Sequence, residues 1–109
     1  MDSNDTVCPS IQNAFDLLGK KWTGLIINVL STGEKHFCDL QRAVPPLSDR
    51  MLVLRMKELE EADIVEREVL IGSPVRVIYR LTDKGRELRP IMDAIASWAG
   101  RWNQAPAHA

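Results

Sequence analysis

Apolar residues recur at helical spacing along the first part of the chain and predict four consecutive helices. The first two end near Gly19 and Gly33, since glycine is a common helix stop. The third is short because Pro45-Pro46 prevents its continuation, and Ser48 can cap the fourth, which extends to about Ala62. The positions expected to face inward are Ile11, Ala14, Phe15 and Leu18, then Trp22, Leu25, Ile26, Val29 and Leu30, then Leu40 and Val44, and finally Leu52, Met56 and Leu59.

The pattern changes at Ile64, where strand-forming residues begin and then alternate with polar ones. Two strands separated by Gly72-Ser73-Pro74 predict a hairpin over 64–82. Thr82 can cap a last helix, which Pro90 is expected to kink. Its apolar positions are Leu88, Ile91, Met92, Ile95, Trp98 and Trp102, and residues 105–109 are expected to form a frayed tail.

This order of elements is that of a winged helix-turn-helix. We therefore expect one α+β, mostly α, domain over 1–109, with the helix-turn-helix at 37–62 and a two-stranded wing at 64–82. The composition agrees, since 109 residues that are 45% apolar and 27% charged suit one small core.

Several classes of protein are excluded by what the sequence lacks. It has no apolar run of about 18 residues and no basic leader, so we expect a cytoplasmic protein without a membrane association. Two cysteines cannot build a disulfide framework, and with His36 and His108 they make a poor zinc site. No metal or cofactor is expected.

The outward face of the fourth helix carries Arg50, Leu54 and Lys57, with Val53 beside it. An exposed Leu54 suits contact with a thymine methyl group, and Arg50 suits guanine or phosphate. An ordinary solvated face, with Lys57 paired to Glu61, is the alternative.

Basic residues also gather in the hairpin and the segment after it, where they suit phosphate contacts. A charged strand edge that resists aggregation is the alternative. The basic residues are Arg67, Arg76, Arg80, Lys84 and Arg86, set against Glu68 and Asp83.

Cys8 precedes Pro9, which is favourable at the first position of a helix, so Cys8 is expected at the helix N-cap. The unpaired N–H groups and the positive end of the helix dipole there stabilise a thiolate, the form that reacts with oxidants and electrophiles. Packing against a partner subunit is the alternative for Cys8. Cys38 is expected to fill the core, or else to form a disulfide with Cys8 of the other subunit.

An ordered series of motifs resembles the HxlR-type family of bacterial winged-helix transcriptional regulators. The series runs over nearly the whole folded chain. It comprises Cys8-Pro9, Gly19-Lys20-Lys21-Trp22, Phe37, Leu40, Pro45, Ser48, Leu52, Arg55, Leu59-Glu60, Arg67, Pro74, Val77, Tyr79, Leu81-Thr82 and Gly85.

The resemblance implies a homodimer on pseudo-palindromic, double-stranded promoter DNA, with the fourth helix in the major groove. It implies base or groove contacts by Asp49, Arg50, Val53 and Leu54. It implies phosphate contacts by Lys20, Ser48, Arg55 and Arg76, although an ion pair of Arg55 with Glu58 or Glu60 competes with that role.

The chain departs from the family pattern at three positions. Asp63 stands where the family has a glycine that ends the fourth helix, and Asp is less comfortable there if φ is positive. His36 and Pro46 stand where Arg and Gly are common, which puts detail near the turn in doubt.

The apolar stripe of the last helix is longer than a core of this size needs. The family dimerises through its terminal helices, so we assign 8–19 and 83–104 to a dimer interface, with an internal stripe as the alternative. The interface residues are Ile11, Phe15, Ile95, Trp98 and Trp102.

The function that these features favour is that of a dimeric regulator, expected to repress, whose DNA binding is switched by an oxidant, a quinone or another electrophile at Cys8. A regulator without thiol sensing and a winged-helix protein-interaction module are the alternatives. A small thiol enzyme with His36 as base is disfavoured, because Cys38 lies only two residues away and no oxyanion motif is visible.

Overall fold

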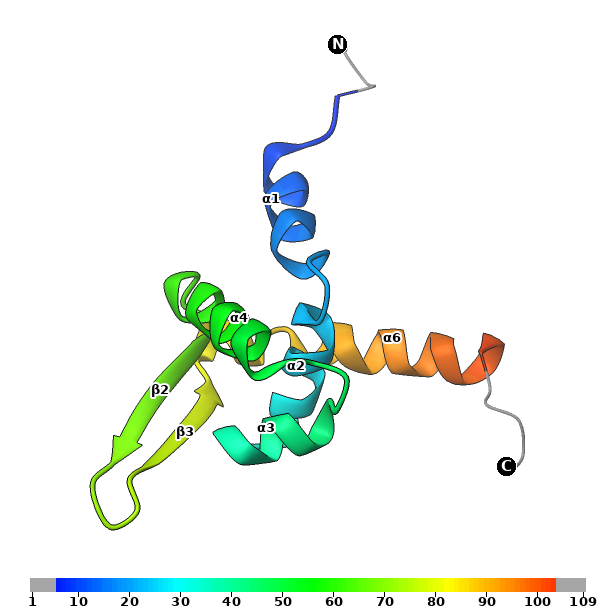
Figure 1. Ribbon diagram of the computed structural model, residues 1–109. Helices are drawn as coiled ribbons and strands as arrows, with labels where there is room; N and C mark the ends of the chain where they lie inside the picture. Colours follow the sequence, from blue (N-terminus) through cyan, green and yellow to red (C-terminus); the bar gives the residue numbers. More distant parts are fainter. Residues whose placement is uncertain (1–5, 104–109) are drawn as a thin grey trace.

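The computed structural model describes residues 6–103 and contains the predicted helices and hairpin in the predicted order (Figure 1). Ser48 begins the fourth helix as expected, because its hydroxyl oxygen accepts from the backbone N–H of Met51 at 3.1 Å. The elements are α1 (Pro9–Leu18), α2 (Thr23–Leu30), β1 (Lys35–His36), α3 (Phe37–Ala43), α4 (Asp49–Glu61), β2 (Val65–Leu70), β3 (Arg76–Leu81), α5 (Asp83–Arg86) and α6 (Arg89–Trp102).

The expected two-stranded wing is present as β2 and β3, and β1 adds a third strand that the sequence did not predict, giving an antiparallel sheet in the order β1-β3-β2. In the wing, Val65 pairs with Leu81 and Leu70 with Arg76, while β1 pairs Lys35 with Tyr79 on the other side of β3. A strand of two residues is too short to show an alternating pattern in the sequence, and this is why β1 was missed.

The core lies where α2, α3, α4 and the base of the sheet meet. Leu25 is an exception to the expected inward face, since it is 53% exposed while Ile27 is fully buried. Because residues 25–27 are all apolar, the pattern fits two rotations of the helix about its axis, one with Leu25 inward and one with Ile27 inward. The first was predicted, and the structure has the second. The fully buried side chains of the core are Thr23, Ile26, Ile27, Leu30, Leu40, Leu52, Met56 and Leu59.

The last helix is two helices rather than one kinked helix. Thr82 caps α5, accepting from the N–H of Gly85 at 3.0 Å. Pro90 lies in the first turn of α6, where its missing N–H costs nothing, so it begins a helix instead of bending one. Gly85 lies against the Ile64 carbonyl and leaves no space for a Cβ atom. The expected frayed tail, 105–109, lies outside the described residues.

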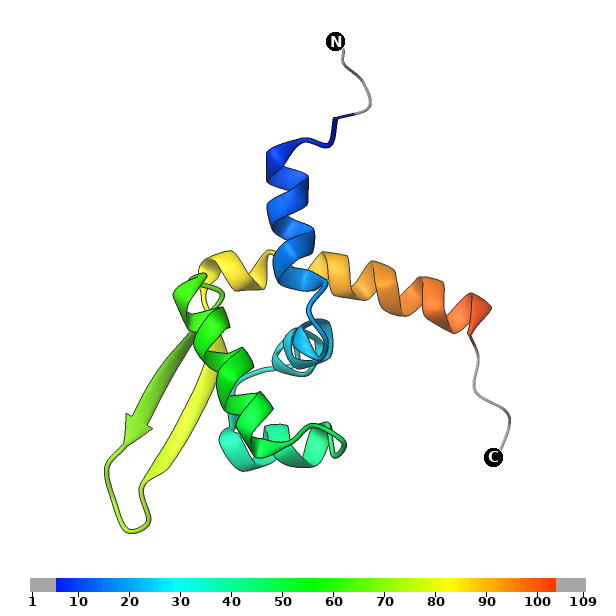
Figure 2. The ribbon, with the colours of Figure 1, turned by 45° about the horizontal axis from the view of Figure 1, so that its top comes forward.

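Two helices project from the domain as arms: α1 and α6 leave it in different directions in both views (Figures 1 and 2). The radius of gyration is 16.3 Å, whereas a compact chain of this length has about 13 Å. None of the α1 residues is buried, and in α6 Met92 is the buried one. Most of the apolar surface of both arms therefore faces solvent in the single chain.

The end of α4 shows how the chain accommodates Asp63 in place of a glycine. Asp63 has φ of 62°, in the left-handed region. The N–H of Ile64 bonds to the Leu59 carbonyl at 2.9 Å and that of Asp63 to the Glu60 carbonyl at 3.0 Å. These two bonds form a Schellman motif, so the helix ends as it would with glycine, at the cost of strain at Asp63.

Asp63→Gly is therefore expected to raise the free energy of unfolding by about 0.5–1 kcal/mol, because glycine adopts positive φ without a Cβ clash. Urea denaturation followed by circular dichroism measures the change. Asp63→Ala is the matched control and should lower stability, since Ala removes the carboxylate but keeps the Cβ. Equal stability of the Gly and Ala variants would contradict the strain.

Candidate functional site

The outward face of α4 is the surface most suited to a macromolecular ligand. Leu52, Met56 and Leu59 are buried, which turns the opposite side of the helix to solvent. Val53 and Leu54 are 49% and 45% exposed. Arg50 and Lys57 are also exposed. We call the surface formed by Arg50, Val53, Leu54 and Lys57 the reading face; it is partly apolar and partly basic.

The beginning of α4 is tied to α3. Gln41 Nε2 donates to Asp49 Oδ1 at 2.7 Å. Asp49 therefore has a structural partner in addition to its predicted groove contact, and Gln41 was not anticipated from the sequence. The Ser48 hydroxyl oxygen is engaged as the cap, while its proton remains able to donate to a phosphate.

Arg55 lies beside the reading face and makes the ion pair that competed with its predicted phosphate contact. Its Nη1 contacts Glu58 Oε1 at 3.0 Å, its Nε donates to the Lys21 carbonyl at 2.8 Å, and its side chain is 13% exposed. Lys20 Nζ contacts the other oxygen of Glu58 at 3.0 Å and stays 43% exposed. Lys20 is thus the more accessible of the two cations for a phosphate.

The wing is less basic than the sequence count suggested, because that count left out Glu66. Arg80 contacts Glu34, Glu66 and Glu68 at 3.1, 3.3 and 2.6 Å. These carboxylates, Glu68 and Glu34 foremost, raise the pKa of the Arg80 guanidinium.

Two further cations at the base of the wing are also engaged within the fold. Arg86 pairs with Asp83, and Lys84 donates to the Ala62 carbonyl at 2.8 Å. Arg67 on β2 donates a hydrogen bond to the Tyr79 hydroxyl. Arg76, at the tip end of β3, is exposed.

Cys8 occupies the predicted N-cap of α1, with Pro9 in the first turn. The thiol is exposed. The backbone N–H groups of Ile11 and Ser10 lower the pKa of the Cys8 thiol below its ordinary value. The site therefore has the two properties of a reactive cysteine, accessibility and a stabilised thiolate.

Cys38 does not fill the core as expected; it is exposed on α3. The inward positions of this short helix are taken by Leu40, and by Val44 just beyond its end, and residue 38 falls on the other side. Cys38 lines a cavity of about 510 Å³ between α3 and the wing, together with His36, Arg76 and Val77. His36 itself is held by Asp39, whose Oδ2 lies 3.4 Å from Nδ1.

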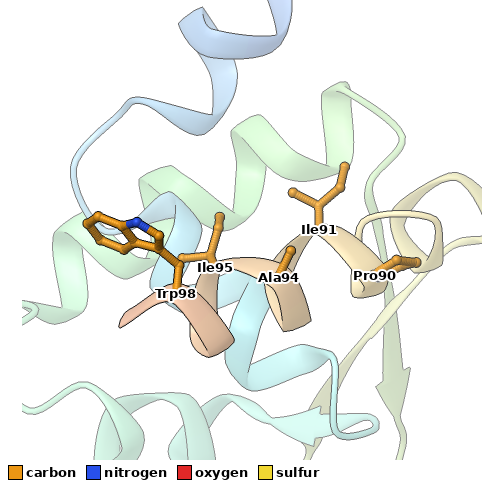
Figure 3. Close-up of a pocket in the computed structure, with 5 residues that line it drawn as sticks. All are labelled: Pro90, Ile91, Ala94, Ile95 and Trp98. Atoms are coloured by element: carbon orange, nitrogen blue, oxygen red, sulfur yellow. The ribbon is translucent and has the colours of Figure 1, made fainter. Parts of the chain in front are cut away.

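The two arms carry apolar faces that the domain does not cover. A shallow hollow of about 420 Å³ runs along α6, lined by Pro90, Ile91, Ala94, Ile95 and Trp98, which follow one another along the helix in Figure 3. The predicted interface residues are all exposed by more than half: Ile11 52%, Phe15 69%, Ile95 54%, Trp98 53% and Trp102 69%.

The described part of the chain has neither a cluster of metal ligands nor a membrane-spanning helix. Residues 6–103 contain no cluster of three or more His, Cys, Asp or Glu side chains that could hold a metal ion. Over the same residues, no helix has the length and apolar character needed to cross a membrane.

Taken together, α3, α4 and the hairpin define a winged helix-turn-helix protein, a class that places its second helix in the DNA major groove. A family model described as HxlR-like helix-turn-helix matches residues 17–107. The HTH-type transcriptional regulator YodB of Bacillus subtilis (strain 168) is 47% identical over 98 residues, which cover 90% of this chain and 88% of that protein.

Solved structures agree with the sequence matches. The reduced form of YodB from B. subtilis has a TM-score of 0.76 at 45% identity, covering 91% of this chain and 97% of that chain. Quinone-bound YodB gives 0.75 at 45% identity, covering 88% and 100%. The redox regulator HypR in its reduced form gives 0.81 at 35% identity, covering 87% and 94%.

The chain belongs to the HxlR-like helix-turn-helix family of DNA-binding transcriptional regulators, as its motifs suggested. It is thus a regulator and not an enzyme, which removes the thiol enzyme from the alternatives.

The reactivity of Cys8 is expected to follow its lowered pKa. The pH profile of its alkylation by iodoacetamide, followed by mass spectrometry, should have a midpoint below that of Cys8 in the urea-unfolded chain, because unfolding removes the α1 N–H groups that stabilise the thiolate. The unfolded chain is the control for intrinsic reactivity. Coincident midpoints would show that the helix start does not activate the thiol.

Proposed function

We propose that this protein is a homodimeric regulator, acting in the cytoplasm, that binds a pseudo-palindromic promoter site as a repressor and is switched at Cys8. The reading face of α4 carries the proposal for DNA: Arg50, Val53 and Leu54 are exposed on a helix whose other side is buried. Asp49 is proposed as a further groove contact, and Lys20, Ser48 and Arg76 as phosphate contacts. Arg55 is left out of the phosphate contacts because it forms the competing ion pair with Glu58.

The dimer part of the proposal rests on the uncovered arms. Monomeric proteins seldom expose several large apolar side chains next to one another on the surface. Association with a second subunit removes such side chains from water. Phe15 on α1 and Trp98 and Trp102 on α6 are the largest such groups. A second copy of the chain, packed through the segments 8–19 and 83–104, is proposed to cover this surface, and each copy would then read one half-site.

The switch part rests on Cys8. Its thiolate is stabilised at the start of α1, which is one of the arms proposed to form the dimer. YodB has been crystallised with quinone, and HypR is a redox regulator, so similar chemistry is proposed here for an oxidant or quinone. Modification at Cys8 would change the angle between the α4 helices of the two subunits. The population of dimers would then shift away from the DNA-binding form.

Cys38 is proposed as a partner for Cys8 across the dimer, since both thiols are exposed. Adduct formation at Cys8 alone is the other route to the same switch. Mass spectrometry after oxidation distinguishes them, because only the first gives a linked pair of chains.

Trp98→Ala is expected to raise the dimer dissociation constant by about 30-fold or more, as loss of a buried aromatic anchor does. Sedimentation equilibrium measures it. Val69→Ala, which trims an apolar side chain 43% exposed on the wing, is the matched control and should leave the constant unchanged. A wild-type monomer at all concentrations would refute the dimer.

The regulator is tested by fluorescence anisotropy on the DNA upstream of its own gene and on a scrambled duplex at fixed salt, because phosphate contacts make affinity salt-dependent. We expect specific binding that weakens after quinone treatment in the wild type but not in Cys8→Ser. Arg50→Ala should lose about 1–3 kcal/mol of specific binding free energy.

Lys35→Ala, which removes a positive charge from β1 outside the proposed DNA contacts and dimer segments, is the control and should bind as the wild type does. Specific binding that ignores quinone would retain the regulator and refute the sensor. Equal affinity for the scrambled duplex would remove the support for autoregulation and favour the protein-interaction module.

A further inference from the structure

Three side chains join the turn after α1 to the middle of the reading helix. Lys20 and Arg55 contact the two oxygens of Glu58 at 3.0 Å each, and Arg55 Nε donates to the Lys21 carbonyl at 2.8 Å. We call this set, Lys20, Arg55, Glu58 and the Lys21 carbonyl, the clasp. Its two sides are more than thirty residues apart in the sequence, and it joins the turn that follows α1 to α4.

The turn that the clasp holds is the main attachment of α1. No residue of α1 is fully buried, and Leu17 and Leu18 at its C-terminal end are the α1 residues that pack against the core. The rest of α1 projects from the domain without such packing (Figure 1). The turn itself is well ordered by backbone bonds, from Gly19 N–H to Phe15 at 2.7 Å and from Thr23 N–H to Lys20 at 3.2 Å. The direction of α1 therefore depends on how the turn is fixed to the domain.

Trp22 fixes the other side of that turn. It has φ of 79°, a left-handed conformation that is costly for a bulky residue. Its ring packs on the core, and the Lys21 ammonium lies 5.0 Å from the ring centroid. Core packing on one side and the clasp on the other together hold a strained turn in one geometry.

The clasp is built to be stronger than a surface ion pair. Arg55 and Glu58 side chains are 13% and 24% exposed, and Arg55 uses two of its nitrogens on two different acceptors. Lys20 first and Arg55 second lower the pKa of the Glu58 carboxyl. The carboxylate is therefore ionised and bound at neutral pH.

We propose that the clasp makes α1 and α4 move together. Arg55 and Glu58 are then positioning residues that transmit a movement of α1 to α4. Leu54 precedes Arg55 directly on α4, which places the reading face within one turn of the clasp. The inference rests on the proposed function, in which α1 carries the thiol and α4 reads DNA. Without the clasp, α1 could turn at residues 19–22 while α4 stayed in place.

Thermodynamic linkage gives a test that does not involve Cys8, because coupling between two sites is reciprocal. Hydrogen–deuterium exchange is measured for α1, residues 9–18, with and without the upstream duplex, because the turn after α1 contains Lys20, itself a proposed phosphate contact. In the wild type the duplex should slow exchange there by about fivefold, and in Glu58→Gln this protection should disappear. Affinity for the duplex should stay within about threefold, since Glu58 is not among the proposed DNA contacts and α4 keeps its buried face.

Glu61→Gln is the matched control, with the same loss of charge on the exposed side of the same helix, and it should keep the protection. Exchange over 26–30 in the core should be equal in all three proteins, which excludes general unfolding.

Wild-type-like protection in Glu58→Gln, or no protection in a wild type that binds DNA, would overturn the clasp as a coupling device. A loss of affinity beyond tenfold in Glu58→Gln would also overturn it, by showing that Glu58 acts in binding itself. Absence of any specific DNA binding would be a failure of the proposed function instead.

The same variants then report on the switch. Quinone treatment lowers the DNA affinity of each protein by some factor. That factor should be about tenfold smaller for Glu58→Gln than for the wild type or Glu61→Gln, because the movement of α1 no longer reaches α4. An equal response in all three proteins would overturn the proposed transmission. A wild type that does not respond would refute the thiol switch alone, since the exchange experiment judges the clasp independently.

Discussion

The burial of one side of α4 is the constraint on which the rest of the molecule depends. Leu52, Met56 and Leu59 are 0–1% exposed, and burial of three such side chains contributes on the order of 5–9 kcal/mol. That energy fixes the rotation of the helix about its axis. The direction in which Arg50 and Leu54 point is thus decided by the core, and the reading surface needs no separate device to present it.

Much of this could be read from the sequence, and the reason is that helical periodicity is a local property. The spacing of Leu52, Met56 and Leu59 was enough to place α4 and to predict which residues lie outside, and Ser48 marked its start. Cys8 before Pro9 was likewise enough to place a thiol at a helix N-cap.

The features that were missed depend on contacts between distant segments. β1 exists because it pairs with β3, more than forty residues away. Cys38 was expected inside because its residue type is usually buried, but the short α3 has few inward positions and they go to larger side chains. One partner of Arg55 could be predicted from the sequence, because Glu58 lies one helical turn further along α4. The other, the Lys21 carbonyl, could not, because it is distant in the sequence and is brought near only by folding.

The ion pairs of Arg80 make the charge of the wing uneven along its length. Residues that pair directly across antiparallel strands share one face of the sheet, so Glu66 and Arg80 lie on the same face as Leu70 and Arg76. Near the base, three carboxylates surround the Arg80 guanidinium and offset its charge, whereas Arg76 lies exposed at the tip end of β3. On this face of the hairpin the cation available to an approaching anion is therefore the one at the tip, while the cation near the base is already surrounded by carboxylates.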